Sequence, residues 1–244
     1  MNITPTPAQL EERRNLIFLV LTGLFLGTLS MLNILGLTRF LWLGKISNWP
    51  IVVAVGALPY PVTFLCTDLI SELWGERRAT QVVWVGLLLN AWVVFILWLG
   101  GILPAIPGGE SSQTFHEIQR LAFGSIGASM IAYIVAQFID VRLFHFWKNF
   151  TNGKALWLRN NGSTLVSQLV DTTAVVLISH FAAHVLPISS EKPVLTQLLS
   201  FIASGYSFKA LAALADTLPF YALTIWLRSW LQIPGAAAEL SEES

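Results

Sequence analysis

The chain has 244 residues, of which 55% are hydrophobic and only 11% are charged, and its formal net charge is zero. Soluble domains carry about 25% charged residues, so this deficit indicates that a lipid bilayer is the solvent. The neutral balance, without a dominant basic cluster, argues against nucleic acid as a partner. The single cysteine, Cys66, excludes an internal disulfide and leaves too few thiolates for a cysteine-built metal site.

A membrane-spanning helix needs roughly 20 mostly apolar residues. Six segments meet this requirement, namely 15–37, 50–71, 79–103, 118–139, 164–186 and 197–230. The connections between them are short and polar or rich in glycine and proline, and several of the ten tryptophans flank the apolar runs as an interfacial belt would. The sequence therefore predicts an all-α polytopic membrane protein with six transmembrane helices in one bundle.

The distribution of lysine and arginine predicts the orientation of this bundle. With the N-terminus inside, nine basic residues lie on the inner side and four on the outer side. The inner set is Arg13, Arg14, Arg77, Arg78, Arg142, Lys148, Lys154, Arg159 and Arg228, and the outer set is Arg39, Lys45, Arg120 and Lys192. Cytoplasmic loops carry such an excess. We therefore expect a six-helix transmembrane domain over 15–231 between cytoplasmic tails at 1–14 and 232–244.

Polar residues recur on one face of several predicted spans. Ionisable groups inside a membrane are costly, and they usually face the interior of a bundle or a polar cavity. Residues three or four apart share a helix face. This rule groups Asp68 with Glu72, then Ser125, Ser129, Tyr133, Gln137 and Asp140, then Thr164, Ser167 or Gln168, and Asp171, and finally Tyr206, Lys209 and Asp216. We expect these stripes to turn inward and form one polar chamber, with Asp68 near its cytoplasmic end.

Structural roles are the alternative for these residues. Asp171 and Lys209 are also what a simple ion pair between neighbouring helices requires, and Asp216 is a second candidate partner for Lys209. Asp140, at the predicted end of its span, is suitably placed to pair with Arg142, while Glu72 and the charges after it suit a solvated loop. An ion pair and a binding site are compatible, because the pair can open to admit a ligand.

Motifs of common enzymes are absent from the sequence. It contains no HExxH, no GxSxG and no GxxxxGK[ST], so the usual zinc-protease, serine-hydrolase and ATP-binding constellations are missing. No cofactor or metal site is predicted. These absences favour a carrier over an enzyme.

Four segments, in order, resemble the queuosine-precursor transporters, a family within the wider vitamin-uptake transporter grouping. "TDLISELWGERRA" (67–79) resembles the family's TDL-x-x-E-x-x-G signature, and "ASMIAYIVAQFIDVRLFHFWK" (128–148) is similar to its fourth helix. "STLVSQLVDTTAVVLISHF" (163–181) and "YSFKALAALADTLPFY" (206–221) resemble its fifth and sixth helices. Asp216 is not part of the family pattern.

The resemblance implies a six-helix inner-membrane importer of 7-deazaguanines such as preQ0 and preQ1, for salvage into the tRNA nucleoside queuosine. It also implies kinship with substrate-binding membrane subunits of vitamin importers, some of which need a separate energising module, and a homo-oligomer is a further option. A membrane enzyme and a membrane assembly factor with a buried polar helix interface are the competing interpretations.

The chemistry of such a base selects the expected binding residues. The guanine edge presents an N–H and an amino group, a donor pair suited to a carboxylate, so Asp171 or Asp68 is expected to read it. Gln137, Lys209 or both would contact the carbonyl side, and an aromatic ring such as Tyr133, Tyr206 or Phe208 would cover the flat face. The full expected set is Asp68, Tyr133, Gln137, Asp140, Gln168, Asp171, Tyr206 and Lys209.

Overall fold

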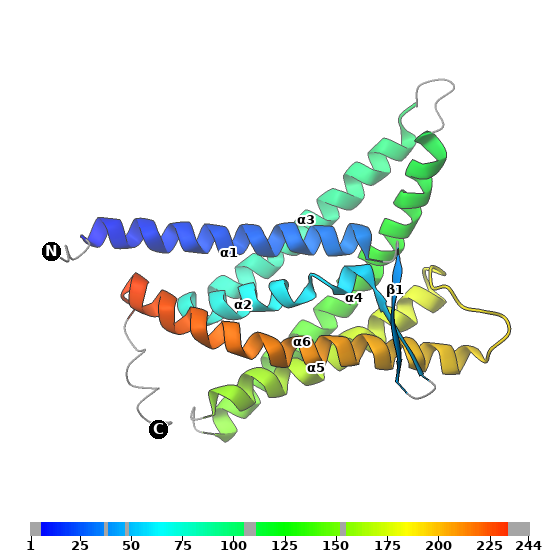
Figure 1. The fold of residues 1–244 in the computed structure, drawn as a ribbon. Helices are drawn as coiled ribbons and strands as arrows, with labels where there is room; N and C mark the ends of the chain where they lie inside the picture. The colour runs from blue at the N-terminus through cyan, green and yellow to red at the C-terminus, as the bar shows by residue number, and fades with distance from the viewer. Residues whose placement is uncertain (1–5, 37–38, 47–48, 105–110, 152–154, 234–244) are drawn as a thin grey trace.

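The computed structural model of the chain describes residues 6–36, 39–46, 49–104, 111–151 and 155–233. Six α-helices account for most of these residues, together with one two-stranded sheet in the described part (Figure 1). Five of the helices are long and apolar enough to cross a bilayer. The predicted all-α polytopic membrane class is confirmed.

Helix α1 (Pro7–Leu35) begins at a capping box. The Thr6 hydroxyl accepts a hydrogen bond from the Gln9 backbone N–H, and the Gln9 side chain accepts one from the Thr6 backbone N–H. Pro7 suits the first turn because a backbone N–H there would have no helical partner. The helix thus starts earlier than the predicted span 15–37. Residues 1–5 and 234–244 of the two predicted tails lie outside the described residues.

The second predicted span, 50–71, is helical only in its later part. Strand β1 (Phe40–Ile46) pairs with β2 (Trp49–Ala54) in an antiparallel hairpin, followed by a 3-10 turn, η1 (Val55–Ala57). The β-branched run 51–53 favours a strand. Proline is tolerated only before a helix or in its first turn. The helix therefore begins between Pro59, which precedes it, and Pro61, which lies in its first turn. Helix α2 accordingly runs from Tyr60 to Trp74.

Helix α2 is too short to cross a bilayer alone. Its 15 residues extend about 22 Å, against a hydrocarbon thickness of about 30 Å. The preceding turn is packed closely against the end of α1, because a Cβ on Gly56 would lie 2.5 Å from the Gly36 Cα and 2.6 Å from the Leu32 carbonyl oxygen. Non-helical backbone within a membrane is stable where protein surrounds it, and the end of α1 supplies such a contact here.

The remaining helices complete one bundle. They are α3 (Glu76–Ile102), α4 (Ser111–Phe150), α5 (Leu156–Phe181) and α6 (Val194–Leu231). Helices α4 and α5 pack along each other, and α6 packs against α5 and α2. Because α4 continues to Phe150, Asp140 lies within a helix and not at its end as expected. Helix α1 begins and α6 ends at the same end of the molecule (Figure 1).

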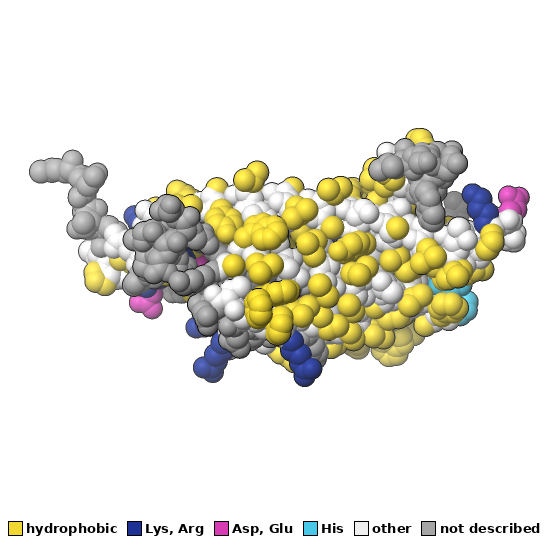
Figure 2. All heavy atoms as spheres, turned by 90° about the horizontal axis from the view of Figure 1, so that it is seen from below, with side chains coloured by type: hydrophobic (Ala, Val, Ile, Leu, Met, Phe, Trp, Pro, Cys, Tyr) yellow, Lys and Arg dark blue, Asp and Glu magenta, His cyan; other side chains and the backbone are white. Residues whose placement is uncertain are grey.

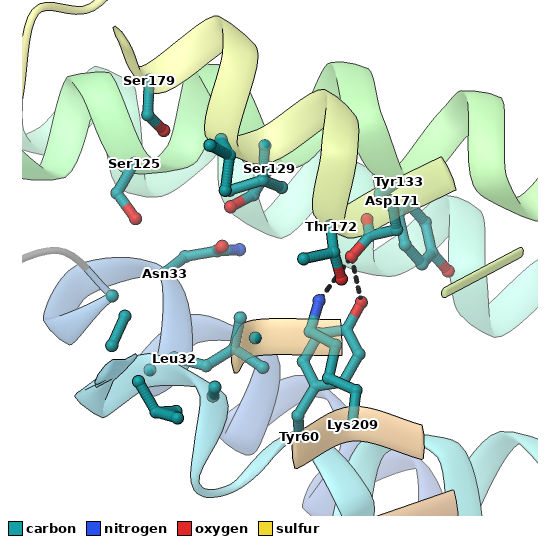
Figure 3. A pocket seen from close by; sticks show the side chains of 18 of the residues that line it. Leu32, Asn33, Tyr60, Ser125, Ser129, Tyr133, Asp171, Thr172, Ser179 and Lys209 are labelled. Carbon is teal, nitrogen blue, oxygen red and sulfur yellow. Dashed lines mark hydrogen bonds and ion pairs between the residues drawn. The ribbon is translucent and has the colours of Figure 1, made fainter. Parts of the chain in front are cut away.

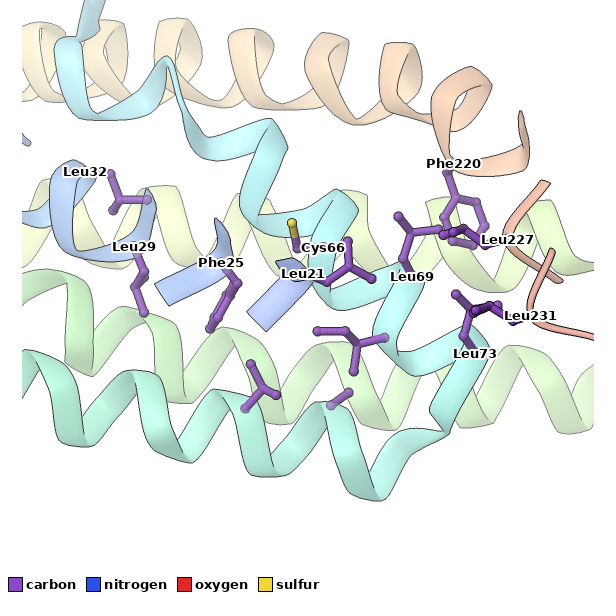
Figure 4. Close-up of a cluster of buried hydrophobic side chains, with 13 residues drawn as sticks. Leu21, Phe25, Leu29, Leu32, Cys66, Leu69, Leu73, Phe220, Leu227 and Leu231 are labelled. Carbon is purple, nitrogen blue, oxygen red and sulfur yellow. The ribbon is translucent and has the colours of Figure 1, made fainter. Parts of the chain in front are cut away.

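Apolar side chains fill the interior at that end and also cover the outside. The core cluster joins α1, α2, α3 and α6, with Phe25, Leu69 and Leu227 among its members (Figure 4). Many other large apolar side chains point outward, and the face seen in Figure 2 is mostly hydrophobic. A water-soluble protein rarely exposes so much apolar surface, whereas a protein surrounded by a lipid bilayer requires it.

Candidate functional site

A cavity of about 140 Å³ lies where the hairpin meets the bundle, and all six helices contribute to its wall. One water molecule needs roughly 10–15 Å³ of such volume, so the cavity has room for a small organic molecule. Most of the wall is apolar. A mostly apolar cavity with a few convergent polar groups is typical of a small-molecule binding site.

Asp171 of α5 is the centre of the charged groups. Its Oδ2 accepts hydrogen bonds from the Lys209 ammonium at 2.6 Å and from the Tyr60 hydroxyl at 2.9 Å. The Lys209 Nζ also lies 4.0 Å from the centroid of the Tyr60 ring, close enough for a cation–π contact. Three helices thus meet at one carboxylate oxygen (Figure 3).

Placing this ion pair inside a bundle is costly. Asp171 is 4% exposed and Lys209 is 9% exposed, and removing two charges from water costs several kcal/mol per ion before their mutual attraction offsets it. Apolar residues would stabilise the same contact at least as well. The stability of the bundle alone therefore does not explain why this pair is present.

Several polar atoms at the cavity have no hydrogen-bond partner among the described residues. They are the Tyr133 hydroxyl, Thr172 Oγ1, Ser179 Oγ and Asn33 Oδ1. The hydrogen bonds from Tyr60 and Lys209 to Asp171 both go to its Oδ2. Buried polar groups are nearly always paired, so a set of open donors and acceptors around one cavity indicates a polar ligand.

The cavity has two chemically different ends, which Figure 3 shows on opposite sides of the view. The charged end consists of Tyr60, Tyr133, Asp171 and Lys209. The neutral end consists of Asn33, Ser125 and Ser179, with the Asn33 Nδ2 donating to Asn90 Oδ1 at 3.0 Å.

Aromatic rings line the wall between apolar side chains. Phe40 of β1 and Phe201 of α6 both border the cavity, with ring centroids 5.6 Å apart. Phe40 reaches this position because the hairpin folds back over the bundle. These faces suit a flat heterocycle.

Three of the predicted binding residues, Tyr133, Asp171 and Lys209, line this cavity. Gln168 is buried and lines a separate small pocket with Tyr60 and Lys209, and it does not belong to the described lining of the cavity. Tyr206 is half-buried and does not belong to the described lining. The side chain of Gln137 lies outside the described part of the structure.

Asp68 and Asp140 do not share the cavity, which differs from the single chamber expected. Asp68 lines a second pocket of about 10 Å³ with Asp216 and Asn161, and Asp140 accepts a hydrogen bond from Ser167 at 3.0 Å. The reason is the geometry of α2, since Asp68 lies two turns, or about 12 Å, beyond Tyr60. Glu72 also differs from expectation, because it pairs with Arg228 of α6 instead of lying in a solvated loop.

Sequence reasoning missed Tyr60, Asn33, Asn90, Phe40 and Phe201. Asn33 and Asn90 carried a usable signal, since each is an isolated amide within an apolar span. Tyr60 sits between two prolines, which marks a helix start but not a binding role. Nothing in the sequence distinguishes Phe40 or Phe201 from the other phenylalanines.

Comparisons with known proteins agree with a transport role. A family described as "Putative vitamin uptake transporter" matches residues 54–223. A "Probable queuosine precursor transporter" of Bacillus subtilis (strain 168) is 31% identical over 170 residues, which are 66% of this chain and 72% of the relative. A "Queuosine precursor transporter" of Escherichia coli (strain K12) is 26% identical over 173 residues, covering 70% of this chain and 72% of the relative. No solved structure matches.

The family match contains Tyr60, Asp171 and Lys209, and it runs from the end of β2 into α6. It covers more than half of the chain, and it agrees with the apolar spans and the ligand-sized cavity. The resemblance predicted from four short motifs is confirmed, and so is the prediction that the protein is not an enzyme. The chain belongs to the vitamin uptake transporter family.

Proposed function

We propose that this protein imports 7-deazaguanine precursors of queuosine, such as preQ0 and preQ1, across the cell inner membrane for tRNA queuosine salvage. The names of its relatives in Bacillus subtilis and Escherichia coli point to this cargo. The observation that carries the proposal is the cavity itself, in which the buried Asp171 carboxylate, paired with Lys209, lies among apolar and aromatic side chains.

Asp171 is the group best suited to read the base. Its Oδ2 is held by Lys209 and Tyr60, which fixes the carboxylate and leaves Oδ1 to accept from the ring N–H or the amino group of the base. Lys209 has three N–H donors, so it can keep its bond to Asp171 and donate another to the carbonyl oxygen of the base. The Tyr133 hydroxyl is an additional open partner.

The rings around the cavity complete the recognition of a flat molecule. Tyr60, Phe40 and Phe201 present faces or edges to the enclosed space, and a stacked aromatic contact contributes about 0.5–1.5 kcal/mol beyond area burial. An assembly factor would need no such enclosed site and would show no affinity for the base.

Alternating access is the proposed mechanism. The cavity opens to one side, binds the base and then opens to the other side, with the interrupted backbone between β2 and α2 as a natural place for movement. An uptake assay across pH with a protonophore separates proton-coupled import from passive entry followed by metabolic trapping.

Substitution of Asp171 tests the proposal. Asp171→Asn keeps the shape but removes the charge, and loss of a hydrogen bond to a charged group costs about 1.5–3 kcal/mol. We expect affinity for preQ0 or preQ1, measured on detergent-purified protein, to fall by about tenfold to a hundredfold, with uptake falling in parallel when the variant and the unaltered protein are compared at equal amounts of membrane protein.

The matched control is Asp216→Asn, the same change at a carboxylate outside the cavity. This variant should bind the base like the unaltered protein. Unchanged uptake in Asp171→Asn, or absence of binding in the unaltered protein, contradicts the proposal.

A further inference from the structure

We propose that the base leaves the cavity along the seam between α2, α5 and α6, and that the ring of Phe64 closes this route in the conformation described. The route leads toward the end of the molecule where α1 begins and α6 ends (Figure 1). The inference rests on the proposed function and adds to it a path of transport and a gating residue. Phe64 lies outside the described lining of the cavity.

Two smaller pockets continue from the cavity along this seam. The first shares Tyr60 and Lys209 with the cavity and adds Gln168. The second, with a volume of about 10 Å³, shares Phe64 and Ala213 with the first. The three spaces therefore follow one another in a row, and each is joined to the next by residues that line both.

Each of the three helices contributes one residue to this row at every turn. Residues three or four apart lie on the same face of a helix, and eight residues rise about 12 Å. The seam is thus a continuous face that leads two turns away from the buried ion pair. Its rows are Tyr60, Phe64 and Asp68 on α2, Asp171, Gln168 and Thr164 on α5, and Lys209, Ala213 and Thr217 on α6.

Hydrogen-bond acceptors without partners lie along the same row. Gln168 is 2% exposed, and its buried Oε1 has no hydrogen-bond partner. At the second pocket, the buried Oδ2 of Asp216 also has none. Buried polar atoms are nearly always paired, and both atoms accept the same kind of N–H group that Asp171 is proposed to receive from the base. The base can therefore pass from one acceptor to the next.

Phe64 is the barrier on this route. Its half-buried side chain lines both of the smaller pockets, and its ring packs edge-on against Tyr60 with the centroids 4.8 Å apart. In the first of these pockets, α6 contributes the small side chains of Ala212 and Ala213. Movement of one ring would therefore join the spaces. Tyr60, which donates to Asp171 and packs against Phe64, connects the binding group to the barrier.

A larger ring at the barrier tests the gating role. Phe64→Trp should lower the maximum rate of preQ0 uptake by about tenfold or more, while the affinity of the purified full-length protein for preQ0 changes by less than about threefold. Affinity is retained because Phe64 does not belong to the described lining of the cavity. The control is Phe95→Trp on the outer surface of α3, which should change neither quantity at equal amounts of membrane protein.

A thiol placed in the row tests the route itself. In a Cys66→Ala background, Ala213→Cys introduces a thiol between the two smaller pockets, and Ala215→Cys introduces one on the exposed face of the same helix. Labelling with N-ethylmaleimide, recorded by mass spectrometry, should lower uptake by about tenfold or more in the first variant, because the adduct overfills the seam. Its affinity for preQ0 should persist. The second variant should keep both uptake and affinity after labelling.

The outcomes separate this inference from the proposed function. Normal uptake by Phe64→Trp, normal uptake by labelled Ala213→Cys protein, or a thiol at position 213 that stays unlabelled while uptake proceeds would each overturn the route and leave import of the base intact. Loss of affinity in step with uptake in both variants would also overturn it, because the residues would then belong to the binding site. If the unaltered protein binds neither preQ0 nor preQ1, the proposed function fails and the inference fails with it.

Discussion

The Asp171 carboxylate is held in position by two side chains from other helices, Lys209 and Tyr60. Both partners bind the same oxygen, at 2.6 Å and 2.9 Å. Tyr60 in addition places its ring 4.0 Å from the Lys209 Nζ. The three side chains therefore act as one unit, and removing one member alters the surroundings of the other two.

Replacing Lys209 should affect both stability and binding. Lys209→Met leaves a buried carboxylate without its counter-ion, a change that costs about 3–5 kcal/mol in buried pairs. We expect a lower thermal unfolding temperature in detergent and loss of preQ0 binding. The double variant Asp171→Asn with Lys209→Met should recover most of the stability but none of the binding. Normal uptake by Lys209→Met would show that the ion pair is unnecessary.

The spacing of polar residues predicted part of this unit. Asp171 and Lys209 stood out because charges are rare in apolar spans, and the structure brings both to one cavity. Asp68 stood out for the same reason but faces a different pocket. Helical periodicity gives the face of a residue on its own helix, whereas its depth relative to other helices depends on packing that the sequence pattern does not contain.

The hairpin and the short α2 form the part of the fold that differs most from the prediction. Residues 50–58 are apolar, and a short apolar run does not distinguish a buried strand from a helix. The prolines at 50, 59 and 61 were the available signal, since they interrupt helical hydrogen bonding. The long spans that became α3, α5 and α6 were predicted well, because their length and composition permit few alternatives.

The close contact between η1 and α1 should make Gly56 sensitive to substitution. A Cβ at this position would overlap the backbone of Gly36 and Leu32, and neither backbone can move like a flexible side chain. We expect Gly56→Ala to displace the turn and to weaken preQ0 binding by about tenfold or more, as overpacking costs typically 1–3 kcal/mol.

The control for Gly56 is Gly127→Ala on the exposed surface of α4, where a Cβ would meet nothing within 4 Å. That change should leave binding intact and raise stability by roughly 0.5–1 kcal/mol, because alanine is the better helix former. Equal binding by the two variants would mean that the turn tolerates movement without consequence for the cavity.

The molecule as a whole has the distribution of side chains that a bilayer imposes. Apolar residues such as Leu88, Leu211 and Leu218 are more than two-thirds exposed on the outside of the bundle, while the paired charges lie within it. This arrangement is the reverse of the one found in a water-soluble protein. The start of α1 and the end of α6 share one end of the bundle, and the connection from α5 to α6 lies at the other end (Figure 1).

The excess of lysine and arginine on one side of the bundle predicts that the end with the start of α1 and the end of α6 faces the cytoplasm. Labelling with a membrane-impermeant maleimide can test this, because Cys66 is the sole cysteine and is buried. In a Cys66→Ala background, Ser190→Cys at the α5–α6 connection should react when reagent is added to the outer face of the inner membrane. Glu11→Cys near the start of α1 should react only after permeabilisation.

Both positions are exposed in the structure, so accessibility to the reagent depends on the side of the membrane alone. The reverse labelling pattern would invert the orientation, and the base would then have to enter from the end that carries the termini.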